Sequence, residues 1–159
     1  MRDLPFALYR AAQVRELDRI AIEERGIPGY TLMNRAGAAA FTLLRQRWPD
    51  ARWITVVCGG GNNGGDGYVV ARLARQAGLD ARVLTLANPA DPRGDAQTAW
   101  RDAVAADVPM APFTVAGFND AELLVDAILG TGLERDVSGL WREAIETMNA
   151  HPADCFALD

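Results

Sequence analysis

The stretch GGGNNGGDG, residues 59–67, has the composition most suited to chemistry. It places six glycines, two asparagines and one aspartate between two apolar runs. Glycines can adopt positive φ and let a ligand approach the backbone without clashing with a Cβ atom. A helix that follows such a loop offers unpaired N–H groups and a positive dipole end. The stretch therefore predicts a binding site for an anionic group such as a phosphate.

Part of this stretch matches a known dinucleotide pattern. Gly59, Gly61 and Gly64 satisfy G-x-G-x-x-G, which is typical of NAD-dependent dehydrogenases. In those enzymes an acidic residue about 20 positions further on holds the ribose hydroxyls. That position falls on Leu84 here, and the nearest carboxylate beyond it is Asp91. The missing carboxylate disfavours an NAD-dependent oxidoreductase, and the asparagines and aspartate exceed what a pyrophosphate turn needs.

A second candidate lies in LLVDAILGTGLERD, where Asp126 interrupts an apolar strand pattern. A buried carboxylate is costly unless it is paired, hydrogen-bonded or bound to a cation. Together with the Asn63 side-chain oxygen and nearby carbonyls, Asp126 would make an all-oxygen cation site. The simpler alternative is an aspartate that caps a neighbouring loop. The turn Gly130-Thr131-Gly132 and Arg135, which follow, are suited to phosphate.

Several side-chain chemistries are missing or poorly placed. All 16 basic residues are arginine, which excludes lysine Schiff bases, lysine general bases and P-loop lysines. The single histidine, His151, precedes a proline where a helical pattern ends, which favours a solvated residue at a helix C-terminus. Cys58 and Cys155 stand in apolar runs without CxxC spacing, which predicts buried, inert thiols. No disulfide, zinc site or nucleophilic triad is indicated.

The composition is that of an ordinary globular domain, with 159 residues, 50% hydrophobic, 23% charged and a net charge of −5. No basic stripe could neutralise a phosphate backbone, so nucleic acid is not a predicted partner. The N-terminus lacks the pattern of a signal peptide, and no run of about 18 apolar residues occurs. The sequence therefore predicts a cytoplasmic protein without a membrane segment.

After two opening helices, the elements that would position these residues alternate between strand and helix. Apolar spacing predicts the opening helices over residues 10–24 and 31–46. Strands are predicted at 52–59, 81–87, 122–130 and 154–159, with helices at 67–78, 93–106 and 139–150. This order predicts a three-layer α/β/α Rossmann-like fold with a mainly parallel sheet, whose ligands gather at the carboxyl ends of the strands.

Three segments together resemble the YjeF N-terminal domain family, the NAD(P)H-hydrate epimerases: GGGNNGGDG, VDAILGTGLERDVSG and RELDRIAIEERGIPGYTLMNRAG. The resemblance covers nearly the whole chain. It implies interconversion of the R and S forms of hydrated NADH or NADPH (NAD(P)HX), which carry a hydroxyl on C6 of the nicotinamide ring. It also implies a bound potassium ion and an ADP-dependent dehydratase as a fused or separate partner. The oligomeric state stays open, a homodimer included.

The resemblance also implies site residues, position by position. The NNGGD and GTGLxRD segments bind the ligand, and an aspartate at the end of a later strand acts near the ring, as acid and then base. Potassium is held by the second asparagine of NNGGD and the aspartate before GTG, with a downstream serine that has no counterpart here. The implied catalytic residue is Asp159, and the implied ion ligands are Asn63 and Asp126. The implied ligand-binding residues are Asn62, Asn63, Gly64, Gly65, Asp66, Gly130, Thr131, Gly132, Leu133, Glu134, Arg135, Asp136 and Asp159.

Two further expectations accompany the resemblance. Some YjeF-like domains are non-catalytic nucleotide-binding or protein-interaction modules, but a module need not keep NNGGD, Asp126, GTG and Asp159 together, so their joint presence favours the enzyme. Residues 1–159 are expected to be one domain that is cut within its last strand, at CFALD, because folds seldom end inside an apolar parallel strand. Such an end predicts an exposed sheet edge, weak activity and association through that edge.

Overall fold

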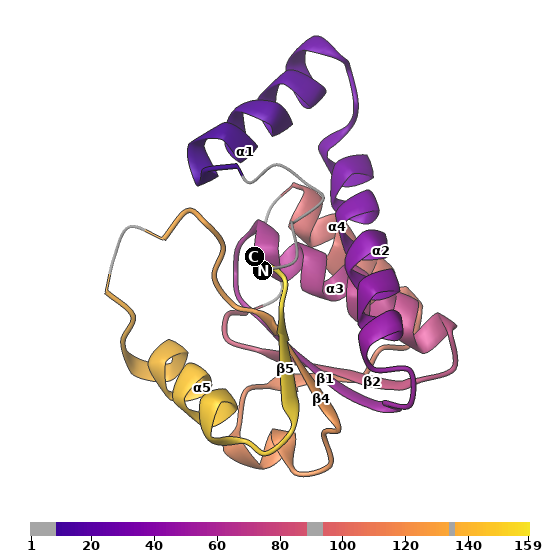
Figure 1. Ribbon diagram of the computed structural model, residues 1–159, viewed down its shortest axis with the longest axis vertical. Coiled ribbons are helices and arrows are strands. Elements are labelled where there is room, and N and C mark those ends of the chain that lie inside the picture. Colours follow the sequence, from indigo (N-terminus) through magenta and orange to yellow (C-terminus); the bar gives the residue numbers. More distant parts are fainter. Residues whose placement is uncertain (1–8, 89–93, 134–135) are drawn as a thin grey trace, which may run out of the picture.

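The computed structural model describes residues 9–88, 94–133 and 136–159. A helical N-terminal part precedes an alternation of strands and helices (Figure 1). In chain order the elements are α1 (Ala11–Arg19), the π-helical turn η1 (Ile20–Glu24), α2 (Gly29–Arg47), β1 (Trp53–Cys58), α3 (Asn62–Gln76), β2 (Asp80–Thr85), α4 (Asp95–Ala105), β3 (Met110–Pro112), the 3-10 turn η2 (Val115–Phe118), β4 (Leu123–Ala127), α5 (Gly139–Ala150) and β5 (Asp154–Ala157).

The five described strands form one parallel sheet in the order β3-β2-β1-β4-β5. Helices α2, α3 and α4 lie on one face of the sheet and α5 lies on the other (Figure 1). The predicted three-layer α/β/α architecture is therefore confirmed. Parallel strands need crossover connections, and the helices that make those connections bury both faces of the sheet.

The central strand β1 is covered on both faces, as its continuous apolar pattern predicts. Val56 packs in the cluster under α2, α3 and α4, whereas Val57 packs on the α5 side. In the parallel register with β4, Val57 lies opposite Asp126 and Cys58 lies opposite Ala127. The carboxyl ends of β1 and β4 are therefore level, and the loops that follow them start side by side.

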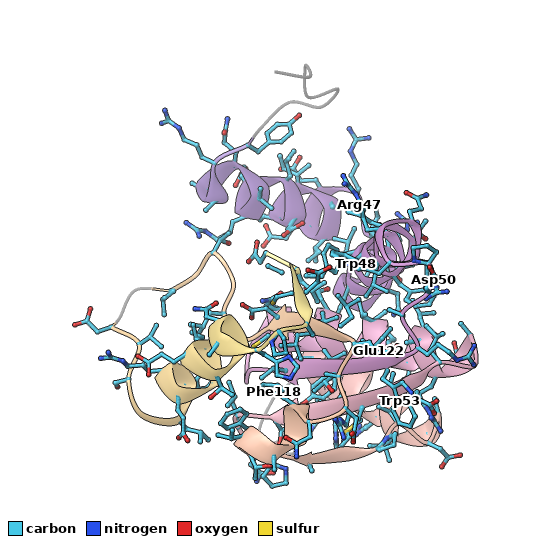
Figure 2. All side chains as sticks on the ribbon, turned by 60° about the horizontal axis from the view of Figure 1, so that its bottom comes forward. Arg47, Trp48, Asp50, Trp53, Phe118 and Glu122 are labelled. Atoms are coloured by element: carbon cyan, nitrogen blue, oxygen red, sulfur yellow. The ribbon has the colours of Figure 1, made fainter. Side chains whose placement is uncertain are left out.

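The amino ends of β1 and β4 are fixed by one carboxylate. Glu122 accepts hydrogen bonds from the backbone N–H groups of Arg52 (2.7 Å) and Trp53 (3.2 Å), and it stands beside Trp53 at this end of the sheet in Figure 2. These two bonds hold the pKa of the Glu122 carboxyl below its usual range. The candidate site lies at the opposite ends of these strands, their carboxyl ends.

Strand β5 lies at the edge of the sheet rather than in the core. Among its residues only Phe156 is half-buried, and its ring lies 5.7 Å from that of Trp48, whose indole N–H donates to Asp154 (2.7 Å). Cys155 is exposed, so the prediction of a buried thiol there is wrong, because an edge strand lacks a neighbour on one side. Cys58 on the central strand is buried, as predicted, and burial raises the pKa of its thiol.

The helices largely match their predicted ranges, and α5 matches residues 139–150 at both ends. His151 follows α5 as predicted, although it is half-buried, with Nδ1 accepting from the Ala153 N–H (3.1 Å). No pattern predicted β3 or η2, because a strand of three residues is too short to show a period. In the described parts of the chain, no helix is both long and apolar enough to cross a membrane.

Candidate active site

The carboxyl ends of β1 and β4 meet where the strand order reverses. From β1 the chain crosses through α3 to β2 on one side, whereas β4 pairs with β1 on the other side. In open parallel sheets this switch point leaves a crevice where ligands bind. The glycine stretch 59–67 follows β1 and the GTG segment follows β4, so the two candidate motifs of the sequence come together there.

The glycine stretch is not the flexible loop that its composition suggests. Helix α3 begins at Asn62, so most of the motif is helical, and none of its glycines has positive φ. Close packing accounts for the glycines instead. A Cβ added to Gly64 would lie 2.2 Å from the carbonyl oxygen of Gly59, and one added to Gly67 would lie 2.5 Å from Cβ of Ala127. These glycines let α3 start directly against the ends of β1 and β4.

Gly59 joins the two motifs through its backbone. Its N–H donates to the carbonyl of Ala127 (3.0 Å), and an added Cβ would lie 2.0 Å from the carbonyl oxygen of Ile128. Gly61 and Gly132 differ, because an added Cβ at either position meets no atom within 4 Å. Packing within the described chain thus requires glycine at position 59. It does not require glycine at positions 61 and 132, which border open space.

Asn63 connects α3 to the loop after β4. Its side-chain NH₂ group donates to the carbonyl oxygen of Leu129 (3.0 Å), and the side chain is half-buried. Its neighbour Asn62 is exposed at the first position of the helix. One predicted asparagine therefore holds the two motifs together, while the other faces solvent at a helix N-terminus, where anions are favoured.

Asp159 lies beyond β5 and reaches the same place. Its Oδ2 accepts a hydrogen bond of 2.6 Å from the N–H of Thr131, and a Cβ added to Gly130 would lie 2.5 Å from that oxygen. The backbone of the preceding residue, Leu158, donates to the carbonyl of Asp126 (3.0 Å). The carboxylate is thus seated in the GTG turn, which has room for it because residue 130 has no side chain.

Asp66 faces the same region from α3. Its side chain is half-buried, and burial raises the pKa of the carboxyl to about 7, with further contributions from the negative charges of Asp159 and Asp18. A carboxyl with this pKa is about half protonated near neutral pH. The site therefore combines a carboxylate held by a backbone N–H with a second carboxyl that can carry a proton.

The raised pKa makes a prediction about stability. Between pH 4 and 7 the folded protein binds more protons at Asp66 than the unfolded chain does, so stability is lost as pH rises through this window. Asp66→Asn is expected to raise the free energy of unfolding at pH 8 by about 2 kcal/mol, after allowance for partial solvent exposure, and to change it little at pH 4. Urea unfolding at both pH values, beside the exposed Asp120→Asn as control, measures this. An equal gain at both pH values would contradict the assignment.

Asp126 is half-buried near the end of β4, and its Oδ1 accepts the N–H of Ile128 (2.9 Å). This bond matches the simpler sequence alternative, a carboxylate that caps the following loop. Within the described ranges, no three histidine, cysteine, aspartate or glutamate side chains form a group able to hold a metal ion. A cation ligated by amide, carboxylate and carbonyl oxygens stays a prediction.

The rest of the GTG segment lines a pocket of about 140 Å³ between this segment and α5. Gly132, Leu133 and Asp136 are exposed, whereas the predicted residues Glu134 and Arg135 lie outside the described residues, as does Asp91. Sequence reasoning did not identify the α5 contribution to this pocket. The lining residues are Leu129, Leu133, Asp136, Val137, Ser138 and Trp141.

Sequence reasoning predicted α1 as a helix but did not assign it to the site. The guanidinium of Arg15 donates to the carbonyl of Thr131 (3.3 Å), and the charge of Asp18 acts on Asp66. Both residues lie on one face of α1, at positions three apart, where helical side chains are neighbours. The sequence shows that these two residues share a face of the helix. Only the position of α1 against the GTG turn shows that this face borders the site.

Comparisons with known proteins identify the family of this chain. The family described as YjeF-related protein N-terminus matches residues 29–159. The chain is 43% identical over 152 residues to the bifunctional NAD(P)H-hydrate repair enzyme Nnr of Coxiella burnetii, covering 96% of this chain but only 31% of that protein. It is 39% identical over 149 residues to the NAD(P)H-hydrate epimerase of Limosilactobacillus fermentum, covering 94% and 71%. The crystal structure of yeast ynu0 has a similar fold, with a TM-score of 0.84 and 19% identity over 97% of this chain and 70% of that one.

Proposed function

This chain belongs to the YjeF-related protein N-terminus family, and from that premise we propose that it interconverts the R and S forms of hydrated NADH and NADPH. The observation that carries the proposal is the seat of Asp159. Its carboxylate is fixed by the Thr131 N–H against Gly130, at the switch point of a parallel sheet and beside the partly protonated Asp66. The names of the relatives, repair enzyme and epimerase, support the same activity.

The chemistry needs only a proton carrier near the ring. A carboxylic acid protonates the C6 hydroxyl, the C–O bond breaks with the help of the ring-nitrogen lone pair, and water leaves an iminium behind. Water then adds to either face of C6, and the carboxylate takes up the proton that this water loses. Asp159 is proposed as that acid and base, with the Thr131 N–H orienting it and Asp66 holding a proton at neutral pH. Electrons and atoms balance without any oxidant or reductant.

The direct test follows the two epimers by chromatography. Starting from one epimer of hydrated NADH, the protein is expected to produce the equilibrium mixture faster than buffer does, without oxidant, reductant or ATP. A heat-unfolded sample is the control for spontaneous interconversion. Equal rates in the folded and unfolded samples would overturn the proposal and leave a non-catalytic module as the alternative.

The proposal includes a potassium ion held by Asn63 and Asp126. The donor set suits this ion, because the Asn63 NH₂ group donates to Leu129 and its Oδ1 is left to act as a ligand, and Asp126 and the loop carbonyls offer further oxygen atoms. When bound, the ion would supply positive charge close to the site carboxylates.

A dehydratase that removes the hydrate is the proposed partner activity, since the bifunctional relative extends well beyond the matched part. The cytoplasm is the proposed location.

Asp126→Asn tests the ion. The variant is expected to lose most of the dependence of the epimerisation rate on potassium, while its stability falls by less than about 1 kcal/mol, because asparagine can still accept the Ile128 N–H. Rates are measured in KCl and in tetramethylammonium chloride at equal ionic strength. An unchanged response to potassium would show that the ion is held elsewhere, and a stability loss of about 3–5 kcal/mol would favour a purely structural carboxylate.

A further inference from the structure

Helix α1 stands outside the three layers of the fold. None of its residues is buried. The helix lies across the carboxyl end of the sheet, and the β5 arrow points toward it (Figure 1). Arg15 ties the helix to the GTG turn through its bond to the Thr131 carbonyl. This hydrogen bond holds the helix beside the crevice. Hydrophobic burial contributes little to its position, because none of its residues is buried.

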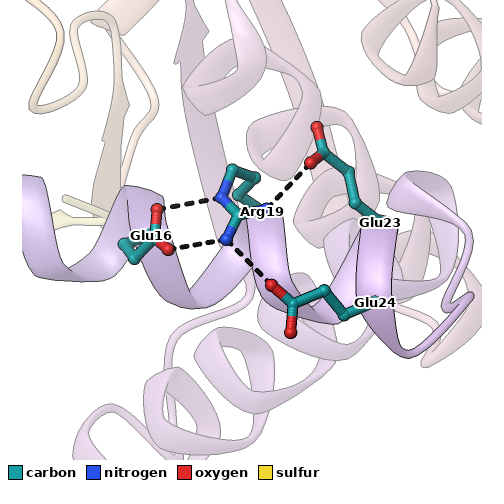
Figure 3. A network of polar contacts seen from close by, with 4 residues as sticks. All are labelled: Glu16, Arg19, Glu23 and Glu24. Atoms are coloured by element: carbon teal, nitrogen blue, oxygen red, sulfur yellow. Dashed lines mark hydrogen bonds and ion pairs between the residues drawn. The ribbon is translucent and has the colours of Figure 1, made fainter.

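The two arginines of α1, Arg15 and Arg19, have different surroundings. Arg19 is surrounded by the carboxylates of Glu16 (2.7 Å), Glu23 (2.9 Å) and Glu24 (2.9 Å), as Figure 3 shows. In the described part of the chain, Arg15 forms no ion pair, and its one bond uses a single N–H of the five that a guanidinium offers. Arg15 is therefore the α1 cation whose charge and donors remain for a ligand.

An anionic ligand in the crevice would need a cation to offset the negative charge of the carboxylates there. Asp18 and Asp159 place negative charge close to Asp66, and this charge would repel a diphosphate. Next to Thr131, Gly132 borders open space. We propose that Arg15 binds the diphosphate of the dinucleotide substrate and that α1 forms a wall of the binding crevice. The inference rests on the proposed function and adds a residue that determines substrate specificity.

The backbone of Thr131 forms hydrogen bonds with both Asp159 and Arg15. Its N–H donates to Asp159, the proposed acid and base, and its carbonyl accepts from Arg15. These two groups are separated by three covalent bonds of one residue. A guanidinium here meets phosphate with charge-assisted, paired hydrogen bonds.

The test compares two substrates that share the hydrated ring. Hydrated NADH carries the diphosphate, and hydrated dihydronicotinamide riboside lacks it. Arg15→Gln is expected to raise KM for hydrated NADH by about 10-fold or more, with kcat changed by less than about 3-fold, and to leave the riboside kinetics unchanged. Arg15→Lys should recover part of the affinity because it keeps the charge. Arg19→Gln, on the same helix, is the matched control and should alter neither substrate.

Other outcomes would overturn the inference. An equal loss on both substrates would mean that Arg15 only holds α1 in place, and unchanged kinetics would remove it from the site. Binding of NADH itself, measured by calorimetry, separates this inference from the proposed function, because NADH carries the diphosphate and needs no turnover. If the unaltered protein binds NADH without epimerising the hydrate, a loss of NADH binding in Arg15→Gln still supports Arg15. Absence of NADH binding by the unaltered protein would overturn it.

Discussion

Replacing Asp159 with asparagine is expected to lower kcat for epimerisation by about 10²–10⁴-fold, the usual contribution of a positioned general acid or base. Asparagine has nearly the same shape, and its side-chain oxygen can still accept the Thr131 N–H, so the GTG turn should keep its conformation. What the variant lacks is the proton that Asp159 is proposed to give to the C6 hydroxyl. Because the hydroxyl departs only in the chemical step, the loss should appear in kcat and leave KM within a few-fold.

Asp154→Asn is the matched control, since it changes the same residue type at the other end of β5, where the carboxylate accepts from Trp48. This variant should keep its activity. Urea unfolding of both variants separates damage to the edge strand from loss of the proton carrier. If Asp159→Asn retains wild-type kcat, another group carries the proton, and Asp66 is the first to examine because its carboxyl is partly protonated at neutral pH.

Gly64→Ala is expected to lower the free energy of unfolding by about 2–3 kcal/mol, as overpacking of a tightly packed interior does. The new Cβ would lie 2.2 Å from the Gly59 carbonyl oxygen, and backbone that is itself bonded to β4 cannot move aside. The higher helix propensity of alanine offsets at most about 1 kcal/mol of this cost. Urea denaturation at one pH measures the difference.

Gly61→Ala provides the contrast within the same motif. An added Cβ at Gly61 meets nothing within 4 Å, and its φ of −107° suits any residue, so stability should change by less than about 0.5 kcal/mol. If a ligand approaches the backbone there, KM should nevertheless rise. Equal stability losses at residues 61 and 64 would show that the motif tolerates no side chain for local reasons, and that packing against Gly59 is not the cause.

Much of the fold could be read from periodicity. The apolar run that became β1 and the amphipathic pattern that became α5 identify their elements because burial of side chains follows directly from local spacing. The alternation of such elements is enough for a three-layer parallel architecture. The same reasoning places the motifs after β1 and after β4 at one edge of the sheet, since parallel strands all end on the same side.

Strand order, by contrast, is a long-range property. It determines which strands lie at the edge of the sheet, and periodicity does not predict this. Cys155 sits in an apolar run that resembles a core strand, but it is exposed because β5 pairs only with β4 in the described sheet. The chain pattern around a residue reports how apolar its neighbours in sequence are. It does not report whether another strand lies beyond them.

The sequence alone determined the family, the fold class and which motifs meet at the carboxyl edge, because these depend on residue types and their spacing along the chain. Only the tertiary structure decided why the glycines of NNGGDG are glycines. They are helical, and they pack against Gly59, Met33 and Ala127 of β4, whereas composition suggested a flexible loop. It also brought Arg15 of α1 to Thr131 and gave Asp66 its raised pKa. Both effects arise from groups distant in sequence, and Coulomb interactions and desolvation depend on distances in space that no local pattern encodes.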